Sequence, residues 1–331
     1  MRRYDARGKK QVTRRIILSG AMTMAVAPAL AEECRIGPPQ HDKGPLVFKD
    51  YDQIELDAAY DQMQYAPLMG QNVKRQASLS EEARSRLGQP LRRQYGQTEI
   101  EALDVYRTTR VDAPIFIFIH GGAWLGGLAK HNAFPAELFV NAGIHYVALD
   151  FIAIKEANGD LRRMAEQVRR GIAWVYRNAA SFGGDRNQIY VGGFSSGGHL
   201  CGVSLLTDWQ KEFSLPPNII KAGLCMSGMY DLKPVRLSKR SEYIKFTDDM
   251  EQAMSSQRQI ERLQVPLTVT YGTNDTPEFQ RQARDFAAAG KAAGKPVELI
   301  EAANFGHQEM LESLANPYGP NGRSALALMK L

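Results

Sequence analysis

The hydrophobic pattern of the chain changes near residue 100. Before that point, apolar residues recur at the spacing of one helical face, at Leu56, Ala59, Tyr60 and Met63. The segment 50–95 is therefore predicted to be helical, and a second, short helix is predicted to start at Ser78 or Ser80, ahead of two glutamates. We treat this segment as a candidate cap over a functional site.

After residue 100, short apolar runs alternate with longer amphipathic stretches. The apolar runs predict strands at 101–110, 114–119, 144–149, 188–193, 220–226, 267–271 and 297–301. The stretches between them predict helices at 160–179, 197–206, 277–293 and 309–315. This alternation predicts the α/β class, with a mostly parallel central sheet and helices on both faces. Ligands of such sheets bind at the carboxyl ends of strands, so residues that follow strands are the candidates for chemistry.

The first 31 residues have a different composition from the rest. Residues 1–15 hold seven lysines and arginines against one aspartate, an apolar stretch follows, and residues 29–31 read A-L-A. This pattern predicts a signal peptide over residues 1–31 and export to the periplasm or the medium. The run T-R-R-I-I-L at 13–18 resembles a twin-arginine signal. The alternative, a basic arm that binds nucleic acid or membrane, does not explain the apolar stretch.

Charge and cysteine content narrow the range of partners. Without residues 1–31 the formal net charge falls from +5 to −1, so we expect no nucleic-acid partner. The apolar stretch is short and contains Pro28, which argues against a stable membrane anchor. Residues 32–331 show no repeats and are expected to form a single domain. No cluster of Cys or His has metal-ligand spacing, and a Cys201–Cys225 disulfide is left open.

A candidate nucleophile follows the predicted strand 188–193. Residues 193–197 read G-F-S-S-G, which is the pattern G-x-S-x-G between a strand and a helix. In that context the serine sits on a tight turn, and only glycines two positions before and after it leave room for the turn. Ser195 is therefore the predicted nucleophile.

A serine hydroxyl needs a base to accept its proton. Only two histidines follow Ser195 in the chain, His199 and His307. His199 lies one turn into the helix after the serine and is expected to pack there. His307 lies in the loop after strand 297–301, at the sheet edge where a base is required, and is the predicted general base.

An acid is expected to orient the imidazole and stabilise its charged form. Asp275 follows strand 267–271 and is the predicted acid. The competitors are Glu278, one helical turn later, and Asp231, which is expected to cap a turn after strand 220–226.

A glycine-rich turn at the end of strand 114–119 predicts an oxyanion hole. Residues 120–124 read H-G-G-A-W. We expect the amides of Gly122 and Ala123 to donate to a developing oxyanion together with the amide of Ser196, while Gly121 shapes the turn. His120 is expected to hold this loop by hydrogen bonds.

Three aromatic residues near strand ends are candidates for a pocket that accepts an aromatic or alkyl group. They are Trp124, Phe194 and Tyr230, and plain packing is an equally good interpretation for each. Residues 233–258 are a second candidate cover.

These motifs, together with S-G-M-Y-D-L-K-P-V at 227–235 and D-T-P-E-F-Q-R-Q at 275–282, resemble one known group over about residues 50–320. The group is the arylformamidase (kynurenine formamidase) and hormone-sensitive-lipase-like branch of the α/β hydrolases. The resemblance implies the α/β-hydrolase fold, and it implies Asp275 as the acid, since this aspartate opens the second run. The family often has N-H-F around its base, whereas residues 306–308 here read G-H-Q.

The sequence thus predicts a serine hydrolase that cleaves a small ester or amide through an acyl-enzyme, without metal or cofactor. Aryl esters, arylformamides, anilides and carbamates are the substrate classes in view. A peptidase or a polymer esterase is the alternative among enzymes. The alternative of another class is a catalytically silent binding protein with this fold, but such proteins usually lack a member of the triad.

Overall fold

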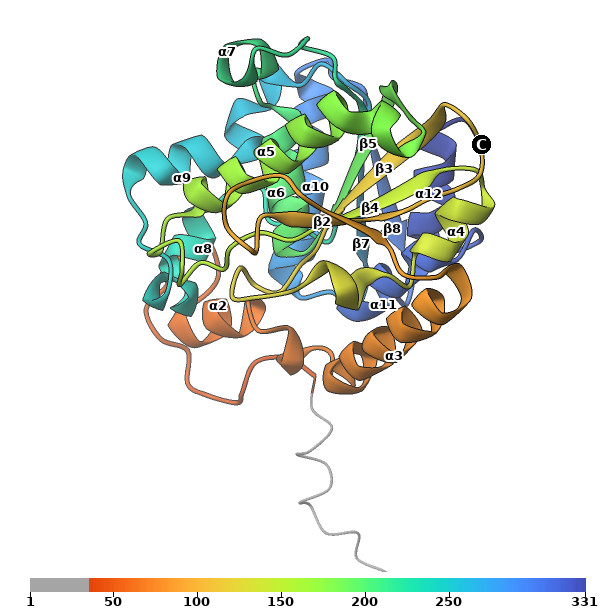
Figure 1. Cartoon of the computed structure of the whole chain (residues 1–331). Coiled ribbons are helices and arrows are strands. Elements are labelled where there is room, and N and C mark those ends of the chain that lie inside the picture. The colour runs from red at the N-terminus through yellow and green to blue at the C-terminus, as the bar shows by residue number, and fades with distance from the viewer. Residues whose placement is uncertain (1–35) are drawn as a thin grey trace, which may run out of the picture. The chain divides into compact units, whose positions relative to one another are not determined.

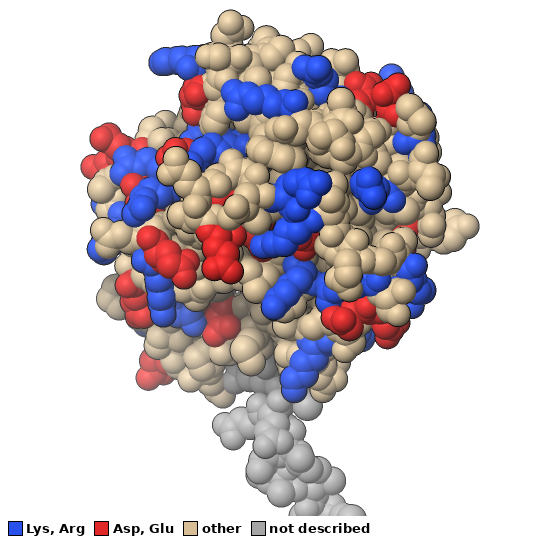
Figure 2. All heavy atoms as spheres, in the orientation of Figure 1, with Lys and Arg blue, Asp and Glu red and all other residues tan. Residues whose placement is uncertain are grey.

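The computed structural model describes residues 36–331, which form one unit of helices around a central sheet (Figure 1). The predicted signal peptide lies outside the described residues. Within 36–331, no helix combines the length and the apolar character needed to cross a bilayer. On the face drawn in Figure 2, Lys and Arg side chains lie interspersed with Asp and Glu.

The sheet has eight strands in the order β1-β2-β4-β3-β5-β6-β7-β8. β1 pairs antiparallel with β2 and β2 antiparallel with β4, whereas the pairings from β4 through β8 are all parallel. The predicted mostly parallel sheet is therefore confirmed. The strands are β1 (Leu91–Gln94), β2 (Ala102–Tyr106), β3 (Ala113–Ile119), β4 (His145–Leu149), β5 (Gly184–Phe194), β6 (Ile220–Met226), β7 (Leu267–Gly272) and β8 (Val297–Ala302).

Helices cover both faces of this sheet (Figure 1). The α-helices are α2 (Gln53–Ala59), α3 (Met69–Leu87), α4 (Ala136–Asn141), α5 (Leu161–Asn178), α6 (Ser196–Leu205), α7 (Trp209–Phe213), α8 (Lys233–Leu237), α9 (Asp248–Met254), α10 (Pro277–Ala292), α11 (His307–Glu312) and α12 (Pro320–Leu328). Short 3₁₀ helices join them: η1 (Gln62–Gln64), η2 (Ala129–Asn132), η3 (Ala179–Phe182), η4 (Lys239–Glu242), η5 (Ser256–Arg262) and η6 (Ser313–Ala315).

The central strand β3 shows how one sequence serves two cores. Side chains alternate across a strand, so Ile115, Ile117 and Ile119 belong to the core under α5, α6 and α10. Phe116 and Phe118 point the other way, into the core under α4 and α12. All seven residues of β3 are buried, which explains why the strand reads as a continuous apolar run.

The segment before residue 100 departs most from the prediction. The first helix ends at Ala59, and Met63 lies exposed in η1 instead of continuing the apolar face. The predicted helix start at Ser78 or Ser80 is wrong, because α3 begins at Met69. Ser80 is buried in the middle of α3, where its hydroxyl donates to the His131 carbonyl at 2.8 Å and so serves tertiary packing.

Strand β1 was not predicted. Its sequence, L-R-R-Q, has one apolar residue and therefore carries no strand signal of its own. It forms because it pairs with β2 at the edge of the sheet. The predicted strand 101–110 is also longer than the observed strand, because β2 spans only Ala102–Tyr106.

The parallel strands bring distant loops to one edge. β3, β5, β6, β7 and β8 run in the same direction, so the loops that follow them meet at the carboxyl edge of the sheet. The end of α2 reaches the same place, because the Thr276 hydroxyl donates to the Ala59 carbonyl at 2.5 Å.

Candidate active site

Ser195 occupies a strained turn between β5 and α6. Its backbone has φ 57° and ψ −122°, a conformation that a non-glycine residue rarely adopts and that costs about 1–3 kcal/mol. The two flanking glycines make the turn possible. A Cβ on Gly193 would lie 2.1 Å from the Gly197 carbonyl oxygen, and a Cβ on Gly197 would lie 2.1 Å from the Ile119 carbonyl oxygen. The turn thus presents the hydroxyl at the carboxyl edge of the sheet.

The structure brings His307 and Asp275 to this hydroxyl. His307 Nε2 lies 2.9 Å from Ser195 Oγ, and His307 Nδ1 lies 2.6 Å from Asp275 Oδ1. The aspartate is 1% exposed and the histidine 2%, so the hydrogen bond between them is shielded from water. The three residues come from the ends of β5, β7 and β8 and are more than 30 residues apart in the chain.

The partners of Asp275 fix the proton on His307. A carboxylate only accepts hydrogen bonds, so His307 Nδ1 carries the proton and donates it to Asp275. Nε2 is then unprotonated and accepts from the Ser195 hydroxyl. The rings of Phe194 and Phe279 hold the imidazole in place, with centroids 4.6 and 5.0 Å from it.

Ser227 is a residue of this site that the sequence reading missed. It follows β6, and its hydroxyl donates to Asp275 Oδ2 at 2.6 Å, beside the Gly272 amide at 3.0 Å. Asp275 therefore has both oxygens engaged, one by these two donors and one by His307. Its position directly after a parallel strand is the signal by which the sequence could have identified it.

The two rival acids lie elsewhere. Glu278 is fully buried, but it pairs with Arg281 at 2.7 Å and accepts from the Tyr60 hydroxyl at 3.1 Å. Asp231 accepts from the Lys233 amide and pairs with Arg258, which makes it a turn residue as expected.

The loop after β3 presents free amides beside Ser195. Gly122 and Ala123 have φ of 119° and 55°, and both residues line the cavity that contains the serine hydroxyl. Their N–H groups have no acceptor among residues 36–331. Gly121 packs against the turn, since a Cβ there would lie 2.9 Å from the Phe194 carbonyl oxygen. The next amide, of Trp124, donates to Ser196 Oγ at 3.2 Å and ties this loop to α6.

His199 anchors the same loop from α6. Its Nδ1 accepts from the Trp124 indole at 3.2 Å, and its Nε2 donates to the Met254 carbonyl at 2.9 Å. Burial lowers the pKa of His199 to about 4, so the ring stays neutral and keeps both roles. His120 likewise holds the loop as expected, through Nδ1 and the Gly121 carbonyl at 2.9 Å.

A cavity of about 520 Å³ opens onto Ser195 and His307. Phe194 lines it as predicted. Trp124 and Tyr230 do not, which corrects their assignment to the pocket. The Trp124 indole turns inward to His199, and Tyr230 is fully buried against Phe286, with ring centroids 4.3 Å apart.

The walls of the cavity come largely from two segments outside the sheet. The lining residues before residue 100 are Tyr60, Asp61, Gln62, Met63 and Met69. Those within residues 233–258 are Lys239, Arg240, Glu242 and Tyr243, and Gln308 of α11 lines the cavity next to His307. Both segments named as candidate covers therefore contribute to the walls.

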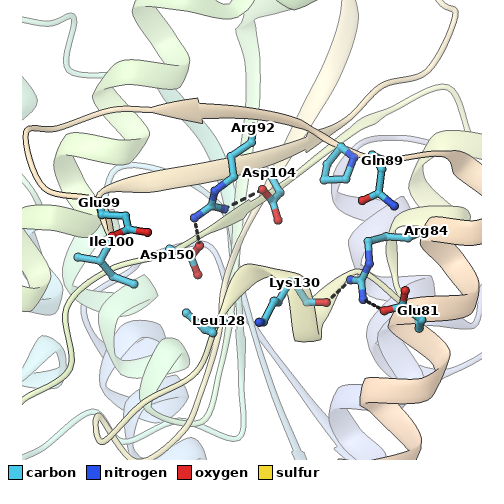
Figure 3. A pocket seen from close by; sticks show the side chains of 11 residues that line it. Glu81, Arg84, Gln89, Arg92, Glu99, Ile100, Asp104, Leu128, Lys130 and Asp150 are labelled. Atoms are coloured by element: carbon cyan, nitrogen blue, oxygen red, sulfur yellow. Dashed lines mark hydrogen bonds and ion pairs between the residues drawn. The ribbon is translucent and has the colours of Figure 1, made fainter.

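A second cavity, of about 750 Å³, lies between α3, β1 and η2 (Figure 3). Neither Ser195 nor His307 lines it. Figure 3 shows Arg92 between Asp104 and Asp150, with a distance of 2.8 Å to each carboxylate. Asp150 also accepts from the Ala129 amide at 2.6 Å, so this ion-pair cluster fixes the chain just beyond the glycine-rich loop.

Cys201 and Cys225 form no disulfide in the structure. Cys201 and Cys225 lie in the core, and the Cys201 thiol donates to the Val191 and Leu224 carbonyls at 3.6 and 3.8 Å. A cluster of His41, Asp52 and Glu55 is close enough to hold a metal ion. Asp52 already caps α2 through the Glu55 amide and accepts from the Gly44 amide in the preceding segment, which accounts for this arrangement without a metal.

The depressed pKa of His199 predicts a pH dependence of stability. The unfolded state takes up a proton near pH 6.5, whereas the folded state resists it until about pH 4. The contribution of His199 to the free energy of unfolding is therefore complete above pH 6.5 and falls by up to about 3 kcal/mol as the pH drops to 4. Chemical denaturation of wild type and His199→Gln between pH 7.5 and 4 measures this. The difference between the two proteins should shrink on acidification; parallel curves would contradict the assignment.

Comparison with known proteins places the chain in a family. The BD-FAE family model matches residues 103–289. A kynurenine formamidase of Danio rerio is 30% identical over 283 residues, which span 81% of this chain and 94% of that protein. Esterase LipC of Mycobacterium tuberculosis is 29% identical over 234 residues, which span 64% of this chain and 58% of LipC.

Solved esterase structures share the fold. Est2 of Thermogutta terrifontis with bound propionate superposes with a TM-score of 0.59 at 20% identity, covering 73% of this chain and 94% of Est2. The carboxylesterase EstE1 from a metagenomic library superposes with a TM-score of 0.62 at 18% identity, covering 80% of this chain and 95% of EstE1. The chain therefore belongs to the BD-FAE family, in the arylformamidase and esterase branch of the α/β hydrolases, and is an ester or amide hydrolase.

Proposed function

We propose that the protein is a serine hydrolase that cleaves a small carboxylic ester or amide through an acyl-enzyme, with Ser195, His307 and Asp275 as its triad. The observation that carries the proposal is the continuous hydrogen-bond chain from Asp275 through His307 to Ser195, which ends at the cavity. Such a chain supplies what a serine hydroxyl needs for attack, a base of the correct tautomer held at hydrogen-bond distance.

In the first step, Ser195 Oγ attacks the substrate carbonyl carbon while its proton passes to His307 Nε2. The imidazolium that forms is stabilised by the Asp275 carboxylate, which Ser227 and the Gly272 amide hold in place. His307 then gives the proton to the departing alcohol or amine as its bond to the carbonyl carbon breaks. The acyl group stays on Ser195.

In the second step, a water molecule repeats the attack on the acyl-enzyme. His307 takes the proton of the water, the carboxylic acid leaves, and the proton returns to Ser195 Oγ. In both tetrahedral intermediates the negative oxygen accepts from the amides of Gly122, Ala123 and Ser196. Each such donor contributes about 2.7–4 kcal/mol to stabilisation of the transition state.

The cavity favours a small substrate with an aromatic or alkyl part. Its volume of about 520 Å³ lies within the usual range for small-molecule sites. Apolar side chains such as Met63, Leu125 and Phe194 line it. The kynurenine formamidase and esterase relatives suggest arylformamides and simple esters as the classes to test first. Gln308 lines the wall where the family often has phenylalanine, so this wall is more polar here.

We also propose that the protein is exported. The support is the charged start, apolar stretch and A-L-A site of residues 1–31. The twin-arginine pattern at 14–15 would carry the chain across the membrane in folded form.

The triad predicts the effect of removing the nucleophile or the base. Ser195→Ala and His307→Ala should each lower kcat for 4-nitrophenyl acetate by at least about 10⁴-fold, because neither variant can form the acyl-enzyme efficiently. If deacylation is slower than acylation, stopped-flow mixing of wild type with the same ester should release a burst of nitrophenol equal to the enzyme concentration. Substantial turnover by a folded Ser195→Ala protein would refute the assignment.

The acid is tested by a matched pair of variants. Asp275→Asn should lower kcat by about 10⁴-fold, since an amide in place of the carboxylate favours the wrong tautomer of His307. Glu278→Gln should lose far less activity and act mainly on stability, because it leaves Arg281 without its full partner. Kinetics and denaturation of both variants give the ranking, and the opposite order would reassign the acid.

Export is tested on protein from the native host or from a bacterial host that has the twin-arginine pathway. N-terminal sequencing of the mature chain should begin near Glu32, and Arg14→Lys/Arg15→Lys should retain the precursor in the cytoplasm. A mature protein that still starts at Met1 would defeat this proposal.

A further inference from the structure

Arg240 lies in the wall of the catalytic cavity with most of its donors unused. It belongs to η4 and is 6% exposed. One guanidinium nitrogen, Nη2, donates to the Tyr60 carbonyl at 2.9 Å. The other two, Nε and Nη1, are buried without a partner among residues 36–331. These two nitrogens carry three N–H groups that have no acceptor at hydrogen-bond distance among residues 36–331. The Tyr243 hydroxyl is the neighbouring polar group that interacts with the guanidinium, and it is neutral.

Among residues 36–331, Arg240 forms no ion pair with a carboxylate, although Glu242 of the same η4 also lines the cavity. Its guanidinium lies between two aromatic rings, 5.6 Å from the Tyr60 centroid and 5.5 Å from that of Trp124. Burial raises the pKa of Tyr60 and of Tyr243, so these neighbouring phenols are neutral at physiological pH. The nearby carboxylate of Asp61 is taken by Lys239 at 3.0 Å. The positive charge is therefore buried and unpaired.

Other partly buried arginines of the chain are paired. Arg281 contacts Glu278 and Asp285, and Arg258 contacts Asp231 and Glu251. A buried charge is retained in proteins when it meets a partner of the opposite sign, because desolvation otherwise opposes burial. A structural role accounts for the single bond from Arg240 to Tyr60, but it leaves the remaining donors unexplained.

Gln62 provides a second, independent observation in the same cavity. It belongs to η1, from the other covering segment, and is also 6% exposed. Both atoms of its carboxamide, Nε2 and Oε1, lack a partner among residues 36–331. Two neighbouring wall segments thus each bring an unsatisfied, buried polar group to the cavity that holds Ser195.

We propose that Arg240 and Gln62 form a subsite for a carboxylate of the substrate, so that the natural ester or amide carries one negative charge outside the bond that is cleaved. A carboxylate matches the single unpaired positive charge and accepts from both the guanidinium and the carboxamide. The flanking rings keep water away from the pair and strengthen its attraction. This inference deepens the proposed hydrolase function and rests on it.

The test compares substrates that differ only in this charge. One pair places it on the leaving group, 3-acetoxybenzoate against its methyl ester. The other places it on the acyl group, mono(4-nitrophenyl) glutarate against the 4-nitrophenyl ester of monomethyl glutarate. In at least one pair, wild type should favour the acid by about 10- to 100-fold in kcat/KM, mainly through KM, as expected for hydrogen bonds to a charged group.

The variants locate the preference. Arg240→Met should bring the ratio of kcat/KM for acid and neutral ester, measured on the same variant, close to one, whatever its overall activity. Arg240→Lys should restore part of the preference by returning the charge. Gln62→Leu should weaken the preference for the acid several-fold. It is the alternative test of the subsite if Arg240→Met does not fold. Lys245→Met is the control, because it removes an exposed positive charge of the same segment that does not line the cavity.

Equal kcat/KM for acid and neutral ester in both pairs, or a preference that survives Arg240→Met, would overturn the subsite. Failure of wild type to hydrolyse even the neutral esters would instead count against the proposed function. Calorimetric binding of 3-acetoxybenzoate and its methyl ester to Ser195→Ala, with and without Arg240→Met, then decides the subsite without catalysis. Binding that is equal for both ligands would overturn it.

Discussion

The buried hydrogen bond between Asp275 and His307 is the constraint on which the rest of the site depends. It sets which imidazole nitrogen carries the proton and thereby which nitrogen faces Ser195. The bond exists only because the parallel strands β5, β7 and β8 end at one edge, and because Ser227 and Gly272 hold the far oxygen of the carboxylate. The strand order thus positions the Asp275–His307 bond, and this bond sets the protonation of the imidazole that faces the strained turn at Ser195.

The parts that could be predicted from the sequence are those with local signals. Periodicity located the parallel strands, and the glycines around Ser195 marked the turn because no other residue fits there. The segment before residue 100 could not be read in this way. The limits of α3 and the existence of β1 are set by tertiary contacts, such as the bond from Ser80 to the His131 carbonyl and the pairing of β1 with β2.

The side chains of the cavity wall show the same limit. Aromatic character alone could not tell that Phe194 faces the cavity while Trp124 turns inward, since the direction of Trp124 depends on its bond to His199. Arg240 and Gln62 gave no sequence signal either. Their interest comes from their surroundings. Two covering segments that lie far apart in the chain meet at the cavity that contains Ser195, and among residues 36–331 the side chains of Arg240 and Gln62 keep polar atoms without partners. The triad residues thus come from the ends of the sheet strands, whereas much of the cavity wall comes from the segments that cover them.

A crystal structure of the protein inactivated by a small aryl phosphonate tests the central claim most directly. The phosphorus should be bonded to Ser195 Oγ, its oxygen should accept from the amides of Gly122, Ala123 and Ser196, and His307 should keep its contact with Asp275. A phosphonate attached to another residue, or an oxygen directed away from these amides, would contradict the account.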